Sequence, residues 1–171
     1  MRLRLWTRDN AVVAVRTAAV CLASYVAGTW FTALFHTRTS ILGGVWSVVS
    51  AIVVLQATLE DTRGSALLRV LGTFIGATVA ALYLVVFPFH PLGMAAAVGV
   101  TVLACQGLDV PDHARLAAVT VVIVLAVSVA DPTIRPALNA LLRFLESCIG
   151  AGIATLALFL TPGARRRLRT G

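Results

Sequence analysis

The chain has 171 residues, of which 59% are apolar and 12% are charged, where a soluble domain usually carries about 25% charged residues. All 14 of its basic side chains are arginine, and the net charge is +7. Because these arginines flank apolar segments and gather at the two ends, they indicate membrane topology and argue against nucleic-acid binding. The composition therefore predicts one membrane domain over residues 1–171 and excludes a soluble catalytic domain.

The first half of the chain holds three apolar segments long enough to cross a hydrocarbon layer of ~30 Å as helices. The predicted spans cover residues 11–35, 40–59 and 65–87. Residues 36–39 form a tight break, and residues 60–64 form a polar loop. Strands of membrane barrels alternate in polarity and are about half as long, so these continuous runs predict helices.

The second half repeats this organisation. Its predicted spans cover residues 92–108, 116–130 and 136–160, and Pro136 suits the first position of a helix. Residues 88–91 form an uncharged turn, and residues 109–115 form the longest polar break. We therefore expect an all-α membrane protein with six transmembrane helices and a basic tail at residues 162–171.

Loop arginines are distributed unevenly between the two sides of the membrane. With six spans, both termini and the second and fourth loops share one side and hold nine arginines, while the other side holds Arg38 and Arg135. An excess of arginine marks the cytoplasmic side. We expect a multi-pass protein of the cell (inner) membrane with both termini in the cytoplasm.

Two octads match at an offset of 74 residues: RVLGTFIG begins at Arg69, and RFLESCIG begins at Arg143. The same offset superimposes the first three spans on the last three. This predicts two repeats, over residues 10–87 and 88–161, with the second copy upside down in the membrane, as in many transporters. The alternative is a chance match, because small residues at such spacing recur in membrane helices.

Signatures of enzymes and cofactor sites are missing. His36, His90 and His113 fall in three separate loops, and the three cysteines fall in three different spans. The glycines of RVLGTFIG lack the lysine and the flanking strand of a phosphate-binding loop. We expect no enzyme activity, no cofactor and no metal site.

Charged residues within spans are the strongest candidates for a site. Arg143 and Glu146 lie two to three turns inside the last span, where a charge costs at least ~2.5–3.5 kcal/mol. Their spacing allows them to pair on one helix face, either as a functional pair or as a solvated pair in the membrane interface. Arg69 opens the third span, where a positive charge suits an anion. Arg69 and Arg16 could instead extend toward lipid phosphates.

Two uncharged residues of the second span are further candidates. Gln56 either lines a polar path or caps a helix end. Trp46 either anchors the helix in the interface or forms a wall for an aromatic ligand.

The pattern of these residues resembles the fusaric acid resistance and aromatic acid exporter superfamily. It consists of an apolar helix from Trp46 to Gln56, then Thr62, Arg69, Gly72-Thr73 and Gly76. The segment with Arg143, Glu146 and Gly150 is similar to the last helix of the same six-helix unit. Typical members are several times longer, with a cytoplasmic domain and often a second unit.

The resemblance implies efflux of small organic anions such as aromatic carboxylic acids. Arg69 and Arg143 would attract the carboxylate, and Trp46 or Phe74 would contact its apolar body. Glu146 would neutralise Arg143 in the empty site and could carry a proton. Alternatives are a passive anion channel, as in the related plant malate channels, and a non-transporting membrane subunit. The expected partners are lipid, the organic anion and a second copy of the chain, with no nucleic acid.

Overall fold

The structure is a computed structural model that describes residues 8–56 and 58–160. Within these residues it contains helices, short loops and no strand, which confirms the all-α prediction. The elements are α1 (Arg8–Ala33), η1 (Thr37–Thr39), α2 (Ser40–Val54), α3 (Leu59–Val86), α4 (Pro91–Gly107), η2 (Pro111–His113), α5 (Ala114–Ala130) and α6 (Pro136–Leu160), η denoting a 3-10 helix. The predicted basic tail at residues 162–171 lies outside the described residues.

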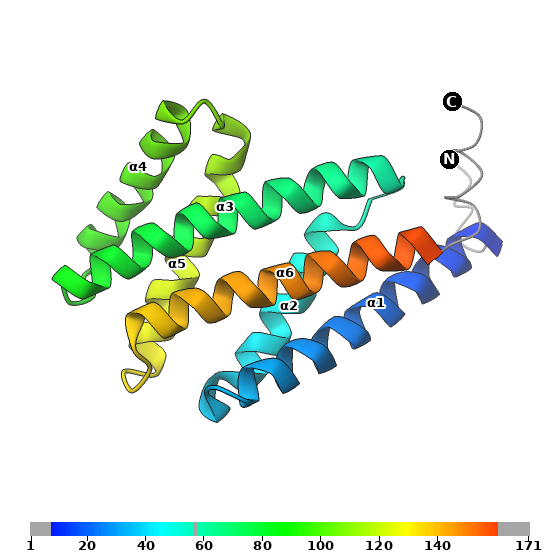
Figure 1. Cartoon of the computed structure of the whole chain (residues 1–171), viewed down its shortest axis with the longest axis horizontal. Helices are drawn as coiled ribbons and strands as arrows, with labels where there is room; N and C mark the ends of the chain where they lie inside the picture. The colour runs from blue at the N-terminus through cyan, green and yellow to red at the C-terminus, as the bar shows by residue number, and fades with distance from the viewer. Residues whose placement is uncertain (1–7, 57, 161–171) are drawn as a thin grey trace, which may run out of the picture.

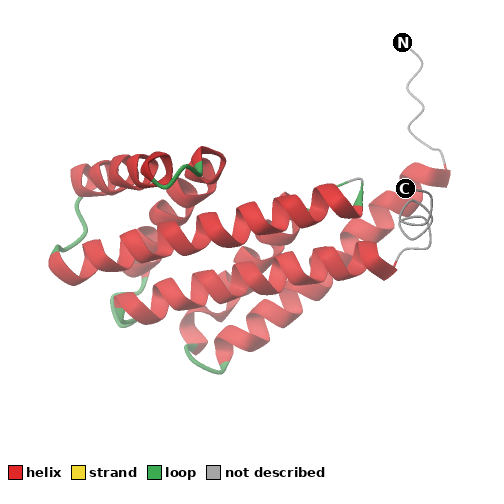
Figure 2. Ribbon diagram, turned by 45° about the horizontal axis from the view of Figure 1, so that its top comes forward, coloured by secondary structure: helices red, strands yellow, loops and turns green. Residues whose placement is uncertain are grey.

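Helices α3 and α6 lie side by side at the centre and run in opposite directions (Figure 1). On one side, α2 packs on α6 and on α1, and on the other, α5 packs on α3 and on α4. The loops between helices are short (Figure 2). The α1–α2, α3–α4 and α5–α6 connections lie at one end of the bundle, and the start of α3 and the end of α6 lie at the opposite end (Figure 1).

Five of the six described α-helices are long and apolar enough to cross a membrane, when η1 is counted with α2 and η2 with α5. Helix α4 has 17 residues, about 25 Å of helix, which is less than the ~30 Å hydrocarbon layer. It ends at Gly107 because Asp109 adopts a positive φ of 58° and Pro111 follows. The prediction of six full-length spans thus holds for five helices.

Large apolar side chains cover the outward faces of the helices. Val85, Leu92 and Leu103 are 72%, 76% and 68% exposed on the isolated chain. An apolar surface on this scale is covered by lipid in a membrane protein. Together with the span lengths, it identifies a multi-pass membrane protein.

The predicted loop at residues 60–64 is wrong, because α3 already begins at Leu59. The Thr58 side chain accepts a hydrogen bond from the backbone N–H of Asp61 at 3.1 Å, which caps the helix. Glu60 and Asp61 lie in the first turn, where negative charge favours the positive end of a helix. A short polar run thus starts a helix here.

The start of α3 also changes the place of Arg69. This residue lies ten positions after Leu59, about 15 Å along the helix axis. The interpretation of Arg69 as a first-turn residue is therefore wrong. The second span is also shorter than predicted, since α2 ends at Val54 and not at residue 59.

The two halves place their helix ends at corresponding positions. Helix α1 ends at Ala33 and α4 at Gly107, and α2 begins at Ser40 and α5 at Ala114. Both pairs, like the starts of η1 and η2, are 74 residues apart, which is the offset of the matching octads. The packing recurs too, because α2 packs on α6 as α5 packs on α3.

Small residues allow these helices to approach closely. A Cβ atom at Gly76 of α3 would overlap the carbonyl oxygen of Ala117 in α5, and one at Gly150 of α6 would overlap that of Ser47 in α2. The small-residue faces therefore serve contacts within the chain. The expected dimer stays a prediction without an assigned interface.

We expect Gly76→Ala and Gly150→Ala each to lower stability by about 1–3 kcal/mol, since a backbone must move to admit the methyl group. Gly99→Ala and Gly152→Ala are matched controls, because a Cβ there meets nothing within 4 Å. These controls should be neutral or stabilising, as alanine favours helices. Thermal unfolding of the purified variants in detergent measures these changes in stability. If the control variants lose as much stability as Gly76→Ala and Gly150→Ala, the close packing at Gly76 and Gly150 is contradicted.

Candidate functional site

Polar side chains gather where α2, α3 and α6 meet, close to the end of α1. Two apolar cores flank this region, one around Val121 and Leu125 and the other around Val54 and Ala154. We call the polar group between them the central polar cluster, and no member is more than 4% exposed. The members are Thr32, Trp46, Ser47, Ser50, Arg69, Thr73, Arg143, Glu146 and Ser147.

Arg69 is buried in this cluster without a carboxylate partner. Its Nε and Nη2 atoms donate to the Ser50 hydroxyl at 3.2 and 3.1 Å. Its Cζ atom lies 4.5 Å from the centroid of the Trp46 ring, a cation–π arrangement. Among the described residues it forms no ion pair, and it is only 1% exposed. Arg69 therefore does not extend toward lipid phosphates.

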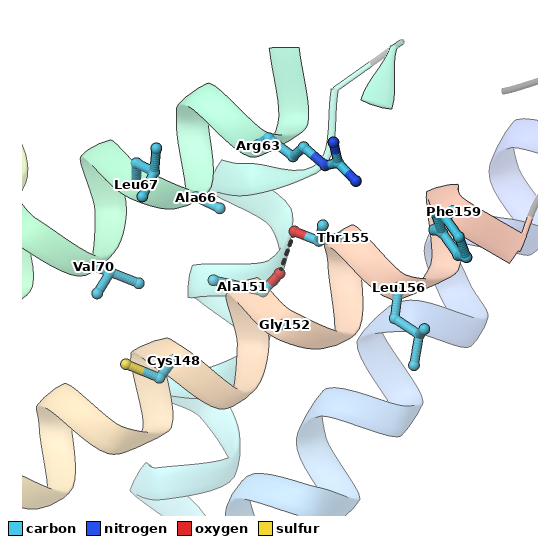
Figure 3. A pocket seen from close by; sticks show the side chains of 10 residues that line it. All are labelled: Arg63, Ala66, Leu67, Val70, Cys148, Ala151, Gly152, Thr155, Leu156 and Phe159. Atoms are coloured by element: carbon cyan, nitrogen blue, oxygen red, sulfur yellow. Dashed lines mark hydrogen bonds between the residues drawn. The ribbon is translucent and has the colours of Figure 1, made fainter. Parts of the chain in front are cut away.

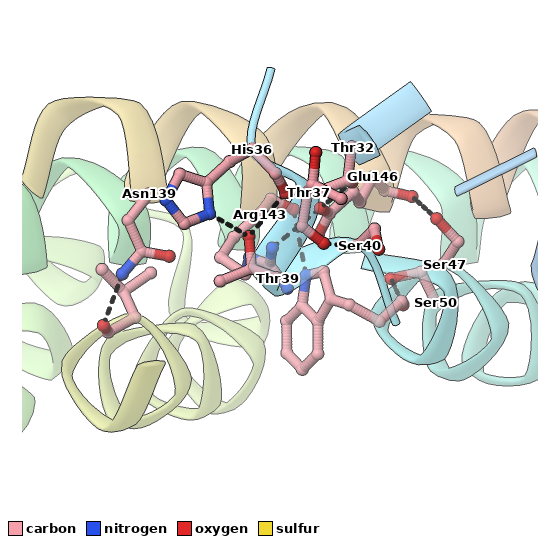
Figure 4. Close-up of polar contacts among 12 residues, drawn as sticks. Thr32, His36, Thr37, Thr39, Ser40, Ser47, Ser50, Asn139, Arg143 and Glu146 are labelled. Carbon is pink, nitrogen blue, oxygen red and sulfur yellow. Dashed lines mark hydrogen bonds and ion pairs between the residues drawn. The ribbon is translucent and has the colours of Figure 1, made fainter. Parts of the chain in front are cut away.

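Arg143 and Glu146 form the pair predicted from their spacing, and the pair is buried (Figure 4). Arg143 Nη2 donates to Glu146 Oε1 at 2.8 Å, and the Thr32 hydroxyl donates to the same oxygen at 2.5 Å. The side chains are 1% and 0% exposed. The pair is thus enclosed by protein and is not a solvated pair at the end of the span.

Trp46 connects the two arginines. Its Nε1 donates to the backbone carbonyl of Arg143 at 2.9 Å, while its ring lies against Arg69. The indole is 4% exposed. Trp46 is therefore an internal residue of the site and not an interfacial anchor.

Hydroxyl groups join the central helices at a point that the sequence analysis missed. The hydroxyls of Thr73 and Ser147 lie 3.1 Å apart, and Ser50 Oγ lies 3.2 Å from Ser147 Oγ. Thr73 and Ser147 are 74 residues apart and each follows its arginine, Arg69 or Arg143, by one turn. This common spacing is the signal that could have identified them.

The charges of the cluster do not balance. Two guanidinium groups, Arg69 and Arg143, face one carboxylate, Glu146, so the cluster carries one excess positive charge when all three are ionised. A buried uncompensated charge is costly. A monovalent anion would neutralise it.

Two predicted site residues lie outside the cluster. Gln56 is exposed in the α2–α3 connection, where its amide donates to the Val53 carbonyl at 3.4 Å. Phe74 is 55% exposed on the outer face of α3, with its ring 5.6 Å from that of Phe144. The structure therefore does not bring either residue to the arginines. Arg16, in α1, is half-buried.

The side chains of His36 and Asp131 approach each other between the α1–α2 turn and the α5–α6 turn. His36 Nε2 lies 3.9 Å from Asp131 Oδ2, and the Thr133 hydroxyl donates to Asp131 Oδ1 at 2.5 Å. The Thr133 hydrogen bonds, with the charges of His36 and Arg38, hold the pKa of Asp131 below its usual value. This carboxylate therefore stays ionised in neutral solution.

An open groove of about 470 Å³ lies on the outer surface between α3 and α6 (Figure 3). Its walls are mostly apolar, with Val70 on α3 and Leu156 on α6, and Arg63 lies toward the start of α3. The Thr155 hydroxyl donates a hydrogen bond to the Ala151 carbonyl at 2.8 Å. The central arginines do not line this groove. Within the described residues, no three His, Cys, Asp or Glu side chains gather to hold a metal ion.

Comparisons with known proteins identify relatives of the chain and its family. The chain is 28% identical over 119 residues to a UPF0421 protein of Oceanobacillus iheyensis, and the match covers 69% of this chain and 33% of the relative. The chain thus spans about a third of the length of the curated relative that it matches. No solved structure matches. The model of the fusaric acid resistance protein-like family matches residues 31–157, which include Trp46, both buried arginines and Glu146, and this confirms the resemblance: the chain belongs to that family.

Proposed function

We propose that this protein moves small organic anions, most of all aromatic carboxylates, out of the cytoplasm. The observation that carries the proposal is the excess positive charge of the central polar cluster, whose charged residues lie 8 to 11 residues into α3 and α6. Ionisable residues buried at membrane depth mark substrate and ion pathways. Membership of the family supports transport over catalysis.

In this mechanism Arg69 is the first anion site. Its guanidinium is held by Ser50, whose neutral hydroxyl leaves the positive charge uncompensated. The carboxylate binds Arg69, and Trp46, already against that side chain, contacts the aromatic body. Arg143 takes part when Glu146 releases it. Gln56 and Phe74 stay predicted contacts for a state in which the helices have moved.

We further infer that six helices cross the membrane as two inverted repeats. The equal spacing of helix ends and the recurrent packing support this, as does the contact between the equivalent residues Thr73 and Ser147. Equivalent positions meet where a two-fold axis passes between two repeats. Helix α4 would then cross a membrane that thins locally around it.

The same proposal places both termini in the cytoplasm. In a variant without native cysteines, Phe89→Cys lies in the α3–α4 turn and should react with an impermeant maleimide applied to intact cells. Arg63→Cys, exposed near the opposite end of α3, should react only after permeabilisation. The reverse pattern would invert the topology.

Flux of 4-hydroxybenzoate into liposomes that contain the purified protein tests the function. Flux that depends on a pH gradient indicates a coupled transporter. Flux driven by voltage alone indicates a channel, and flux no greater than in protein-free liposomes indicates a non-transporting subunit and contradicts the proposal.

A further inference from the structure

Buried polar groups form a row along one face of α6, from its first turn toward its middle. Asn139, Arg143 and Glu146 are spaced by four and three residues, so they share a face. All three are at most 1% exposed. Each carries a buried atom without a hydrogen-bonding partner among the described residues: Asn139 Oδ1, Arg143 Nε and Glu146 Oε2. Nearly all buried polar atoms in proteins are hydrogen bonded, so these three require a partner.

The orientation of the Asn139 amide is fixed by α5. Its Nδ2 donates to the Val124 carbonyl at 2.8 Å and to the Ser128 hydroxyl at 2.9 Å. The nitrogen must face α5, because a carbonyl oxygen only accepts. The Oδ1 atom lies on the other side of the amide, toward Arg143 (Figure 4).

The chemistry of the three atoms selects water as their partner. The oxygens of Asn139 and Glu146 accept hydrogen bonds, while Arg143 Nε donates one. An anion would meet two acceptors, and a metal cation would meet the charge of Arg143. A water molecule can accept from Nε and donate to an oxygen, and buried waters typically make about three such bonds.

The row begins close to the α5–α6 turn. Asn139 is the fourth residue of α6, about 4.5 Å from the helix start. The side chains of His36 and Asp131, 17% and 13% exposed, lie at this end. The row has no counterpart in the first half, because Gly72 occupies the position equivalent to Glu146.

We propose that this row holds a chain of water molecules that conducts protons between the α5–α6 side of the membrane and Glu146. A hydronium ion at the turn gives up its proton, successive waters pass it on, and an O–H bond forms at Glu146 Oε2. The titratable and charged groups around this path are Arg143 and Arg69 in the cluster and His36, Arg38 and Asp131 at the turn.

Protonation would cancel the charge of Glu146 and release Arg143 for the anion. This part rests on the proposed function, whereas the water row rests only on the contacts of α6 and α5.

Access of water to the row can be measured without a transported substrate. In a background without Cys21, Cys105 and Cys148, we would compare the reaction with Ag⁺ of Asn139→Cys, Ala140→Cys and Leu142→Cys. All three positions are at most 7% exposed and lie within one turn of α6. The cysteine at position 139 should react at least tenfold faster than the other two. Equally slow reaction at all three would mean a dry row, and equally fast reaction would mean a solvated helix end; either overturns the proposal.

Proton movement tests the coupling. A pH-sensitive dye inside the liposomes should report proton movement that accompanies 4-hydroxybenzoate flux. Asn139→Leu, checked for folding by its unfolding temperature, should slow that proton movement at least tenfold, and an unchanged rate would overturn the coupling. If the wild-type protein moves no 4-hydroxybenzoate, the proposed function fails, and the Ag⁺ reaction still decides whether the row holds water.

Discussion

Replacing Arg69 by glutamine should reduce 4-hydroxybenzoate flux in liposomes at least 100-fold. Glutamine keeps a polar side chain but removes the excess charge of the central polar cluster, leaving Arg143 and Glu146 to neutralise each other. Two unit charges about 4 Å apart attract by about 4 kcal/mol at an effective dielectric constant of 20. Loss of that attraction corresponds to a factor of roughly 10³ in affinity.

Two control variants separate charge from other effects. Arg63→Gln removes an exposed arginine from the same helix, outside the cluster, and should retain wild-type flux. Arg69→Lys keeps the charge but loses the planar contact with Trp46, and should retain part of the flux. A folded Arg69→Gln variant with wild-type flux would remove Arg69 from the site.

Single substitutions of the Arg143–Glu146 pair should destabilise the protein by about 3–5 kcal/mol, because each leaves the other charge buried alone. Both side chains are at most 1% exposed and are joined at 2.8 Å. The double variant Arg143→Gln, Glu146→Gln should recover most of this stability. Thermal unfolding of the wild type, the two single variants and the double variant measures the interaction energy of the pair as a double-mutant cycle.

The same variants differ in their expected transport. Arg143→Gln, once shown to be folded, should abolish flux, since Arg69 and Glu146 would then cancel. Glu146→Gln should bind 4-hydroxybenzoate as tightly as the wild type or more tightly but release it more slowly, because the competing carboxylate charge is gone. If the double variant transports as well as the wild type, the pair is purely structural and its assignment to the site fails.

Several of the side chains that define the site could not be located from the sequence. Ser50, Thr73 and Ser147 are small residues among many in apolar segments, and only the crossing of α2, α3 and α6 brings their hydroxyls within about 3 Å of one another or of Arg69. Phe74, by contrast, was predicted to lie in the site and does not. It is near Arg69 in sequence, but five residues are almost one and a half helical turns, so its ring points away from the cluster.

Local chemistry explains the error in the α2–α3 connection. A polar run between two apolar segments has the composition of a loop, and hydropathy alone cannot distinguish it from a helix start. The cap by Thr58 and the acidic first turn decide the outcome. The extra turns move Arg69 from the predicted helix start to the interior of α3. There it is buried in the central polar cluster and does not lie at a helix end near lipid phosphates.

The sequence by itself determined that the protein is helical and lies in a membrane, which family it belongs to, and that Arg143 and Glu146 can pair. These properties follow from hydropathy and from spacing along one helix, which need no knowledge of neighbours. Only the tertiary structure decided that Arg69 has no carboxylate partner, that Trp46 lies between the arginines, and that Asn139 points an unsatisfied oxygen along α6. Those facts depend on which helices cross and on where along each helix the crossing lies. Contacts between helices that are distant in sequence determine both the choice of helices and the position of the crossing.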